Sequence, residues 1–272
     1  MKLSFSTVGC PEWRWSEILS AASDLGYDGI EVRGIRKELY APRIQEFSAQ
    51  QAQASKATLR KLNLSISCLS TSCLLGDARV FNNSLYEGRA NIDTAALMGV
   101  PYVRVFAEDT PHASISVDES LVREGLTTLS QYAAQKGVCV LFETNGIYAD
   151  TYKMAELMES VGNPALGVLW DVHHPYRFFG ESPEQSVDNI GQWIRYIHLK
   201  DSIIPDSSVE YKMLGEGDLP IADAIAALQR IGYDGWYTLE WVRRWKMDLE
   251  EPAIVFAHFI RYMHTHFGQA IA

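Results

Sequence analysis

One pattern of hydrophobic and polar positions recurs along the chain. An amphipathic stretch comes first, a glycine or asparagine follows it, and a short run of β-branched or aromatic residues comes next. In one example, apolar residues at Val122, Leu126 and Leu129 precede Gly137 and the run 138–143. Spacings of three and four residues are typical of a helix with one buried face, and a glycine just past a helix supplies the left-handed residue that caps its last carbonyl groups. The pattern therefore predicts a helix, a cap and a strand, in that order.

Eight strand-like runs occur, and helical patterns separate them. We expect strands over residues 2–7, 28–33, 63–69, 101–106, 138–143, 165–171, 194–200 and 235–241, and a last helix over 250–266. The runs are apolar without alternation, which is typical of parallel strands covered by helices. No G-x-G-x-x-G follows a strand, so an open dinucleotide-binding sheet lacks its fingerprint. Eight such units in 272 residues predict an α/β fold, a (β/α)8 TIM barrel in which residues 1–272 form a single domain.

The composition limits the partners and the surroundings of the protein. Hydrophobic residues make up 47% of the chain and charged residues 21%, and the formal net charge is −10. This acidic balance disfavours nucleic acid as a partner, because proteins that bind the phosphate backbone carry basic patches. The four cysteines lack the C-x-x-C spacing of zinc ribbons. The sequence shows neither a signal-peptide core nor an apolar run of membrane-spanning length. We therefore expect a cytoplasmic protein that binds neither nucleic acid nor a membrane.

Ionisable residues stand at the ends of four consecutive predicted strands. Glu143 ends the fifth strand and Asp171 the sixth, and His198 and Glu240 stand near the ends of the seventh and eighth. The carboxyl ends of the strands of a TIM barrel meet at one rim, which carries the active site. Each residue alone has an ordinary explanation, as a solvated carboxylate, a helix cap or a buried histidine. Together they predict a metal site, because buried acids so close to one another repel strongly unless a cation lies among them.

The types of these side chains narrow the choice of metal ion. Three carboxylates and one imidazole form an oxygen-rich site, unlike the thiolate sites of structural zinc. Such a site favours Mn²⁺ or Mg²⁺ and leaves Co²⁺ and Zn²⁺ open. The single nitrogen ligand makes Mn²⁺ our first expectation.

The same residues lie in motifs that resemble a known family. Glu143 at the end of strand five, D-x-x-H at 171–174, H-L-K-D at 198–201 and Glu240 in strand eight resemble the xylose-isomerase-like TIM-barrel superfamily. The likeness is to its sugar phosphate isomerase/epimerase branch, which includes ketose 3-epimerases and inosose isomerases and dehydratases. It covers nearly the whole chain and includes the opening GYDGIEVRG and the loop GEGDLP after strand seven.

This resemblance implies roles for individual residues. The metal ligands would be Glu143, Asp171, His198 and Glu240. His174 would contact the substrate or support a ligand, and His173 would line the pocket. The implied partner is a small carbohydrate substrate, and relatives of this kind are often homodimers or homotetramers.

The constellation suits proton abstraction from a carbon next to a carbonyl group. The metal would polarise the ketone and stabilise the enediolate. Glu143 and Glu240, on strands separated by two others, would face opposite sides of a keto-sugar, an inosose or a related polyol. One would act as base and the other would return the proton. Lys200 and His174 would hold substrate hydroxyls or the developing oxyanion.

Further pocket candidates lie on other strands. Glu31 and Arg33 end the second strand, and Arg104 lies in the fourth. For these three, a salt bridge inside the rim is an equal alternative. Trp13 follows the first strand and would offer an aromatic wall to the CH patches of a sugar, although barrel cores also use aromatic residues.

Other functions stay open at this point. Ketose 3-epimerases of the branch place an arginine shortly after the strand-seven histidine, whereas the segment 198–208 has none. This departure disfavours a free ketohexose as the substrate. A dehydratase or lyase stays an alternative, because the same enediolate can expel a β-leaving group. An AP endonuclease of the superfamily would need additional histidines at strands two to four, and strands three and four have none. The acidic balance also disfavours DNA. A non-catalytic sugar-binding barrel would have less need of two opposed carboxylates.

Overall fold

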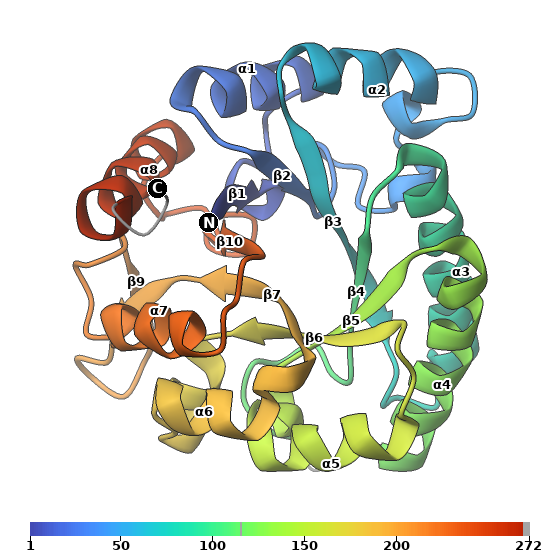
Figure 1. The fold of residues 1–272 in the computed structure, drawn as a ribbon, viewed down its shortest axis with the longest axis vertical. Helices are drawn as coiled ribbons and strands as arrows, with labels where there is room; N and C mark the ends of the chain where they lie inside the picture. The colour runs from blue at the N-terminus through green and yellow to red at the C-terminus, as the bar shows by residue number, and fades with distance from the viewer. Residues whose placement is uncertain (115, 269–272) are drawn as a thin grey trace.

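The computed structural model describes residues 1–114 and 116–268. Eight parallel strands close into a barrel in the order β1-β10-β7-β6-β5-β4-β3-β2, and helices surround it (Figure 1). The barrel strands are β1 (Lys2–Ser6), β2 (Gly29–Val32), β3 (Ser65–Leu74), β4 (Tyr102–Phe106), β5 (Cys139–Glu143), β6 (Leu166–Asp171), β7 (Ile194–Leu199) and β10 (Trp236–Leu239). This architecture confirms the predicted (β/α)8 TIM barrel.

Helices alternate with the strands, as the hydrophobic pattern predicted. The α-helices of the described chain are α1 (Trp15–Leu25), α2 (Ala52–Lys61), α3 (Phe81–Met98), α4 (Glu119–Lys136), α5 (Thr151–Val161), α6 (Pro183–Ile190), α7 (Ile221–Arg230) and α8 (Pro252–Phe267). Local capping explains their ends. The side chains of Asp118 and Asp150 accept backbone N–H groups in the first turns of α4 and α5. Gly137 ends α4 at φ 69°, a left-handed conformation that glycine adopts without strain.

Three local features differ from the sequence-based expectations. Strand β3 runs to Leu74, five residues beyond the predicted end, and β10 ends at Leu239, so that Glu240 follows the strand instead of lying in it. An antiparallel hairpin of β8 (Asp201–Ile203) and β9 (Glu210–Lys212) follows β7. These hairpin strands were not predicted, because three-residue polar strands carry no periodicity that distinguishes them from a loop.

The inside of the barrel has an apolar level and a polar level. Successive side chains of a strand point to opposite faces, so inward positions recur every second residue. At the amino-terminal ends of the strands, inward apolar residues form a cluster separate from the layer between strands and helices. This apolar cluster consists of Cys68, Leu141, Leu169, Tyr196 and Trp236. Two residues further along three of these strands lie Glu143, Asp171 and His198. The interior therefore becomes ionisable toward the carboxyl ends.

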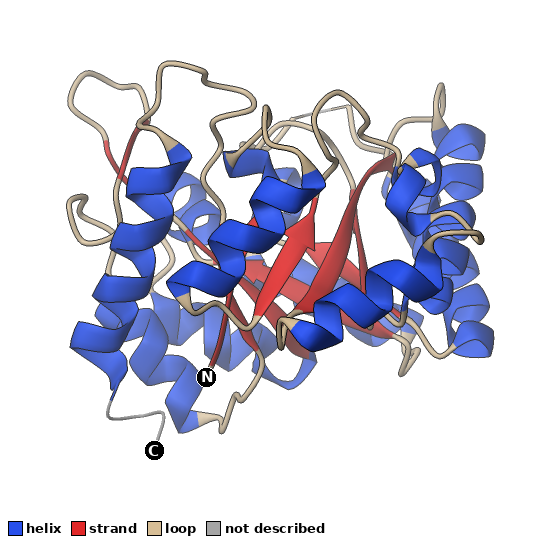
Figure 2. Cartoon of the chain, turned by 90° about the horizontal axis from the view of Figure 1, so that it is seen from above, coloured by secondary structure: helices blue, strands red, loops and turns tan. Residues whose placement is uncertain are grey.

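The two ends of the barrel also differ in their connections. The N-terminus lies on the lower face in Figure 2, where β1 begins, and the longer loops lie on the opposite face. That upper face is the carboxyl-terminal mouth of the barrel, which carries the active site in TIM-barrel enzymes. Within the described ranges, no helix combines the length and the apolar character that crossing a membrane requires.

Candidate active site

Four predicted metal ligands converge at the carboxyl-terminal mouth of the barrel. Glu143 ends β5, Asp171 ends β6, His198 lies in β7, and Glu240 directly follows β10. Each offers one ligand atom, and these atoms all lie within 4.8 Å of one another. Glu143, Asp171 and His198 are buried, and the Glu240 side chain is 12% exposed. The sequence-based expectation that these four side chains lie together is correct in its geometry.

His198 is oriented by a carboxylate on the opposite wall of the barrel. Its Nε2 lies 2.7 Å from the Oε2 atom of Glu31 on β2. Its Nδ1 faces the other acids, at 3.5 Å from Glu240 and 3.9 Å from both Glu143 and Asp171, without a hydrogen bond. A histidine that donates one ring N–H to a carboxylate presents the other nitrogen to a metal in a fixed orientation. Glu31 was predicted as a pocket candidate, and its contact with His198 was not foreseen.

Lysine and arginine side chains lie among the acids as well. The Lys200 ammonium donates to Asp171 Oδ2 and to Glu240 Oε2, both at 2.5 Å. The Arg104 guanidinium forms an ion pair with Glu143, with Nε 3.1 Å from Oε2. We expected an external cation to be the main compensation for these acids. The structure shows that the chain supplies part of it, because both cations are 2% exposed and point into the same space.

Carboxylates outnumber the permanent cations in this space. It holds four carboxylates, of Glu31, Glu143, Asp171 and Glu240, and two permanent cations, those of Lys200 and Arg104. When all four carboxylates are ionised, two negative charges remain with a neutral His198 and one with a protonated His198. The Nδ1 atom of His198 and Oε2 of Glu143 are buried without a hydrogen-bond partner in the described chain. A divalent metal would both balance the charge and complete the coordination of these atoms, so the residues fit one.

The protonation equilibria of the cluster follow from burial and proximity. Burial alone would lower the pKa of His198, but Glu31, Glu240 and Glu143 raise it to about 9. Burial raises the pKa of Glu143, against the opposing effects of Arg104 and His198. Burial also disfavours ionisation of Glu240, yet Lys200 and His198 hold its pKa well below the usual range. The two glutamates therefore differ, with Glu143 the more easily protonated and Glu240 the firmly ionised one.

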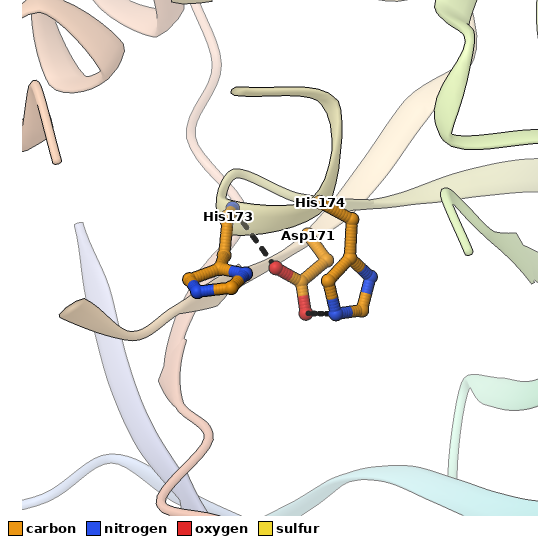
Figure 3. Close-up of side chains that lie close together, drawn as sticks. All are labelled: Asp171, His173 and His174. Atoms are coloured by element: carbon orange, nitrogen blue, oxygen red, sulfur yellow. Dashed lines mark hydrogen bonds and ion pairs between the residues drawn. The ribbon is translucent and has the colours of Figure 1, made fainter. Parts of the chain in front are cut away.

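Asp171 lies between the two histidines of its motif (Figure 3). His174 places Nε2 3.6 Å from Asp171 Oδ2, and its Nδ1 lies 2.9 Å from the Thr144 carbonyl oxygen. Because burial lowers the pKa of His174 to about 4, the ring is neutral near pH 7. Its Nδ1–H then donates to Thr144, which leaves Nε2 as an acceptor facing the site.

The ring of His173 contacts the β8–β9 hairpin, unlike the ring of His174. The backbone N–H of His173 donates to Asp171 Oδ1 over 3.0 Å and helps to fix that carboxylate. Its ring lies 3.0 Å from the Ser202 hydroxyl and 5.6 Å, centroid to centroid, from Tyr211 of the hairpin. Burial lowers its pKa well below the usual range, so the ring is neutral as well. His173 therefore packs between the site and the β8–β9 hairpin.

Asp201 explains why the segments H-L-K-D and GEGDLP occur together. Its buried carboxylate accepts backbone N–H groups from Gly215, Gly217 and Leu219, at 2.9 to 3.2 Å. A Cβ atom at Gly217 would lie 2.0 Å from Asp201 Oδ1, so only glycine permits this approach. Asp201 therefore holds the loop after the hairpin at the mouth. Sequence reasoning placed it near the site but did not identify this role.

The ring of Trp13 contacts a helix outside the barrel. Trp13 follows β1 and is half-buried, with its ring packed edge-on against Phe256 of α8 at a centroid distance of 5.7 Å. The structure thus brings Glu31, Arg104, His174 and Lys200 to the candidate metal ligands, whereas Trp13 packs against a surrounding helix. A sugar-facing role for Trp13 stays a prediction.

Comparisons with known proteins agree with this fold. Residues 19–261 match the family model described as xylose isomerase-like TIM barrel. Fructoselysine 3-epimerase of Shigella flexneri is 25% identical over 267 residues, covering 93% of this chain and 94% of that protein. Inosose dehydratase of Geobacillus thermodenitrificans (strain NG80-2) is 28% identical over 138 residues, covering 44% and 46%.

A solved structure has the same fold at lower identity. The structure titled IOLI protein with a binding zinc atom superposes with a TM-score of 0.79 at 19% identity, covering 98% of this chain and 99% of that one. The closed barrel and the match to the family model over residues 19–261 lead to one conclusion. This chain is a member of the xylose isomerase-like TIM barrel family.

Proposed function

We propose that the chain is a divalent-metal-dependent isomerase or epimerase. Its substrate would be a keto-sugar, an inosose or a related polyol, and the reaction would move a proton at the carbon next to the carbonyl group. The observation that carries the proposal is the convergence of Glu143, Asp171, His198 and Glu240 around an unpartnered Nδ1 atom of His198. A relative named fructoselysine 3-epimerase supports the reaction class.

The proposed metal ligands are the four side chains of the cluster, Glu143, Asp171, His198 and Glu240. When bound, a divalent cation would supply Lewis-acid polarisation of the carbonyl group and stabilise the enediolate. Oxygen-rich sites with one imidazole favour Mn²⁺, and we propose Mn²⁺ on that ground, with Mg²⁺, Co²⁺ and Zn²⁺ as the alternatives. A structure of the same fold whose title names a bound zinc atom supports a divalent ion.

The two glutamates would share the proton transfer. Glu240, whose side chain is 12% exposed at the mouth against 2% for Glu143, would take the proton from the carbon. Glu143, on a strand separated from β10 by two others, would return a proton to the opposite face. In the reverse direction the roles exchange.

The neighbouring polar groups would position the substrate. The Lys200 ammonium, 2.5 Å from both Asp171 and Glu240, is placed to donate to a hydroxyl or a developing oxyanion. The neutral Nε2 of His174 is an acceptor for a substrate hydroxyl. Arg104 would hold Glu143 in place through the ion pair between them.

A dehydratase is the second candidate, favoured by the likeness to inosose dehydratase over nearly half of the chain. The first step would be the same proton abstraction. Loss of a β-hydroxyl group would then replace reprotonation, and it would need a proton donor for the departing oxygen. The Lys200 ammonium group would be this proton donor, because it contacts two of the candidate metal ligands, Asp171 and Glu240.

Product analysis in D2O separates these outcomes. The Mn²⁺-loaded protein would be incubated with free ketoses, ketose–amine adducts and inososes, and products would be followed by NMR and mass spectrometry. We expect an epimer or isomer that carries one solvent deuteron at the carbon next to the carbonyl group. A product lighter by one water would establish the dehydratase instead. Absence of both exchange and dehydration across the panel would leave a sugar-binding barrel and reject the enzymatic proposal.

A further inference from the structure

Arg33 is a buried cation at the mouth of the barrel to which the proposed reaction gives no role. It comes two residues after Glu31, whose carboxylate reaches inward to His198. Two residues advance a strand by about 7 Å, toward the rim. Arg33 is 8% exposed, and its Nη2 donates to the Ser72 hydroxyl over 2.8 Å. Its Nη1 is buried and has no hydrogen-bond partner in the part of the chain that the structure describes.

The guanidinium of Arg33 has no ion-pair partner. Among the described residues it forms no ion pair within 4.0 Å, whereas Arg104 pairs with Glu143 at 3.1 Å. Burial, Arg104 and Arg244 lower the pKa of Arg33, and Glu87, whose effect lies between those of the two arginines, raises it. A buried charge without a partner is costly. The salt-bridge alternative considered for Arg33 from the sequence is therefore not what the structure shows.

The segment after β10 brings a second arginine to the same side of the mouth. The backbone N–H of Arg244 donates to the Val8 carbonyl over 2.9 Å, and its Nη1 donates to the Arg36 carbonyl over 2.8 Å. Its Nε and Nη2 are buried and lack partners among the described residues. The next residue, Trp245, is 59% exposed, and the Cζ atom of Arg33 lies 5.9 Å from the centroid of its ring. Arg33 thus lies over an exposed aromatic ring, and Arg244, the residue before that tryptophan, also has unused N–H donors.

Space for a ligand group lies next to Arg33. Ser72, which accepts the hydrogen bond from Arg33, also lines a cleft of about 430 Å³. The lining of this cleft further includes Lys37, Tyr40, Arg43, Tyr86 and Glu87. Such a volume is within the range of small-molecule sites. Arg33 meets this cleft through Ser72, which lies in β3.

We propose that Arg33, assisted by Arg244, binds an anionic substituent of the substrate, a carboxylate or a phosphate, carried several bonds away from the reacting carbon. A guanidinium matches the planar or tetrahedral oxygens of such groups with paired N–H donors. The inference rests on the proposed function for its reacting end, and it adds the substrate class: ketoses or inososes that bear a negative charge. Carboxylate and phosphate share the recognition chemistry, and the experiment distinguishes them.

Matched substrate pairs test the proposal in the Mn²⁺-loaded protein. The phosphate pair is fructose 6-phosphate and fructose, and the carboxylate pair is the fructose adducts of 6-aminohexanoate and of hexylamine. We expect kcat/KM for solvent-deuterium exchange to be at least about tenfold higher for the anionic member of one pair, the size of one charge-assisted hydrogen-bond contact. The pair that shows the preference identifies the anion. Equal rates within both pairs would overturn the proposal.

Variants assign the preference to Arg33. We expect Arg33→Met to lower the anionic-to-neutral ratio of kcat/KM about tenfold or more, and Arg33→Lys to restore part of it by keeping the charge. Arg79→Met is the matched control, because it removes an exposed arginine from a loop at the same end of the barrel. It should leave the ratio unchanged. If Arg33→Met does not fold, Arg33→Lys and Arg244→Met decide the matter, and an unchanged ratio in both would reject the subsite.

A second measurement is independent of turnover. Inorganic phosphate and acetate would be titrated into the metal-free protein while its melting temperature is followed. We expect one of them to raise the melting temperature of the wild type and of Arg79→Met, with a smaller shift in Arg33→Lys. A shift without any exchange would reject the proposed reaction and keep the anion subsite. Exchange that shows no preference for an anionic substrate would keep the proposed reaction and reject the anion subsite.

Discussion

The two levels of the barrel interior are built on the same strands and differ completely in chemistry. On β5, β6 and β7, the inward residues Leu141, Leu169 and Tyr196 belong to the apolar cluster. Two residues further along, the inward positions are occupied by the candidate ligands of the mouth. The strands, their pairing and their inward face are common to both levels. The change from packing to chemistry therefore depends on a single pleat, about 7 Å of strand.

This contrast separates stability from function. At the apolar level, side chains are buried at low cost and hold the barrel closed. At the mouth, buried ionisable groups lower stability unless they are paired, and their unpaired atoms are available for a ligand. Substitutions at one level should therefore change a different measurement from substitutions at the other.

The largest expected effect is loss of turnover at the mouth. Glu240→Gln removes the proposed base while keeping nearly the same shape, so kcat should fall by about 10³-fold or more, within the range of general acid–base catalysis. The melting temperature should change little. Deuterium exchange and thermal unfolding measure the two effects. Glu210→Gln on the β8–β9 hairpin is the control, and a Glu240→Gln variant with wild-type kcat would contradict the assignment.

The apolar level should respond in the opposite way. Leu169 is fully buried, so Leu169→Ala should destabilise the fold by about 2–5 kcal/mol, the range for such cavities. Denaturant unfolding measures this cost. Metal bound per folded molecule should stay as in the wild type, because Asp171 is fixed by Lys200 and by the backbone of His173. Loss of the metal without loss of stability would show that the two levels are not separable.

Glu31 gives a sharper test of the mouth alone. It contacts His198 Nε2 and is not one of the four ligand-bearing residues. Glu31→Gln should weaken Mn²⁺ affinity by about 10–100-fold, the usual effect of removing the carboxylate behind a ligating histidine. Calorimetric titration of metal measures the change, with exposed Glu124→Gln as control. Unchanged affinity would mean that His198 is not a ligand through Nδ1.

The smallest expected effect is a gradual pH dependence of metal binding. Because the pKa of metal-free His198 is raised to about 9, a metal that binds its Nδ1 must displace a proton below that pH. Apparent affinity should therefore fall about tenfold for each unit that pH decreases between 8.5 and 7. Glu143, whose pKa is also raised, would steepen the fall at lower pH. Affinity independent of pH over this range would contradict coordination by His198.

The barrel and the meeting of the four candidate ligands could be predicted from the sequence, because both follow from the order of strands and helices along the chain. Strand-like runs separated by helical periodicity predicted the barrel, and the rule that strand ends share a rim predicted the meeting of Glu143, Asp171, His198 and Glu240. Contacts between distant segments were not accessible. Glu31 meets His198 across 167 residues, and no local pattern records such a pair.

The remaining gaps have similar physical causes. Lys200 was predicted to hold the substrate, but its position between Asp171 and Glu240 depends on side-chain conformations that no spacing specifies. The hairpin and the role of Asp201 depend on a loop folding back on its own strand. The assignments of the four residues as ligands, a cytoplasmic location and a dimeric or tetrameric state stay predictions.

The central claim is that the mouth of the barrel activates a C–H bond next to a carbonyl group with a metal and Glu240. Its most direct test is the rate of deuterium entry at that carbon, measured by NMR for the wild type with Mn²⁺, the wild type after chelation, and Glu240→Gln with Mn²⁺. We predict rapid exchange only in the first sample. Equal exchange in the chelated or the substituted protein, or none in any sample across the ketose and inosose panel, would contradict the claim.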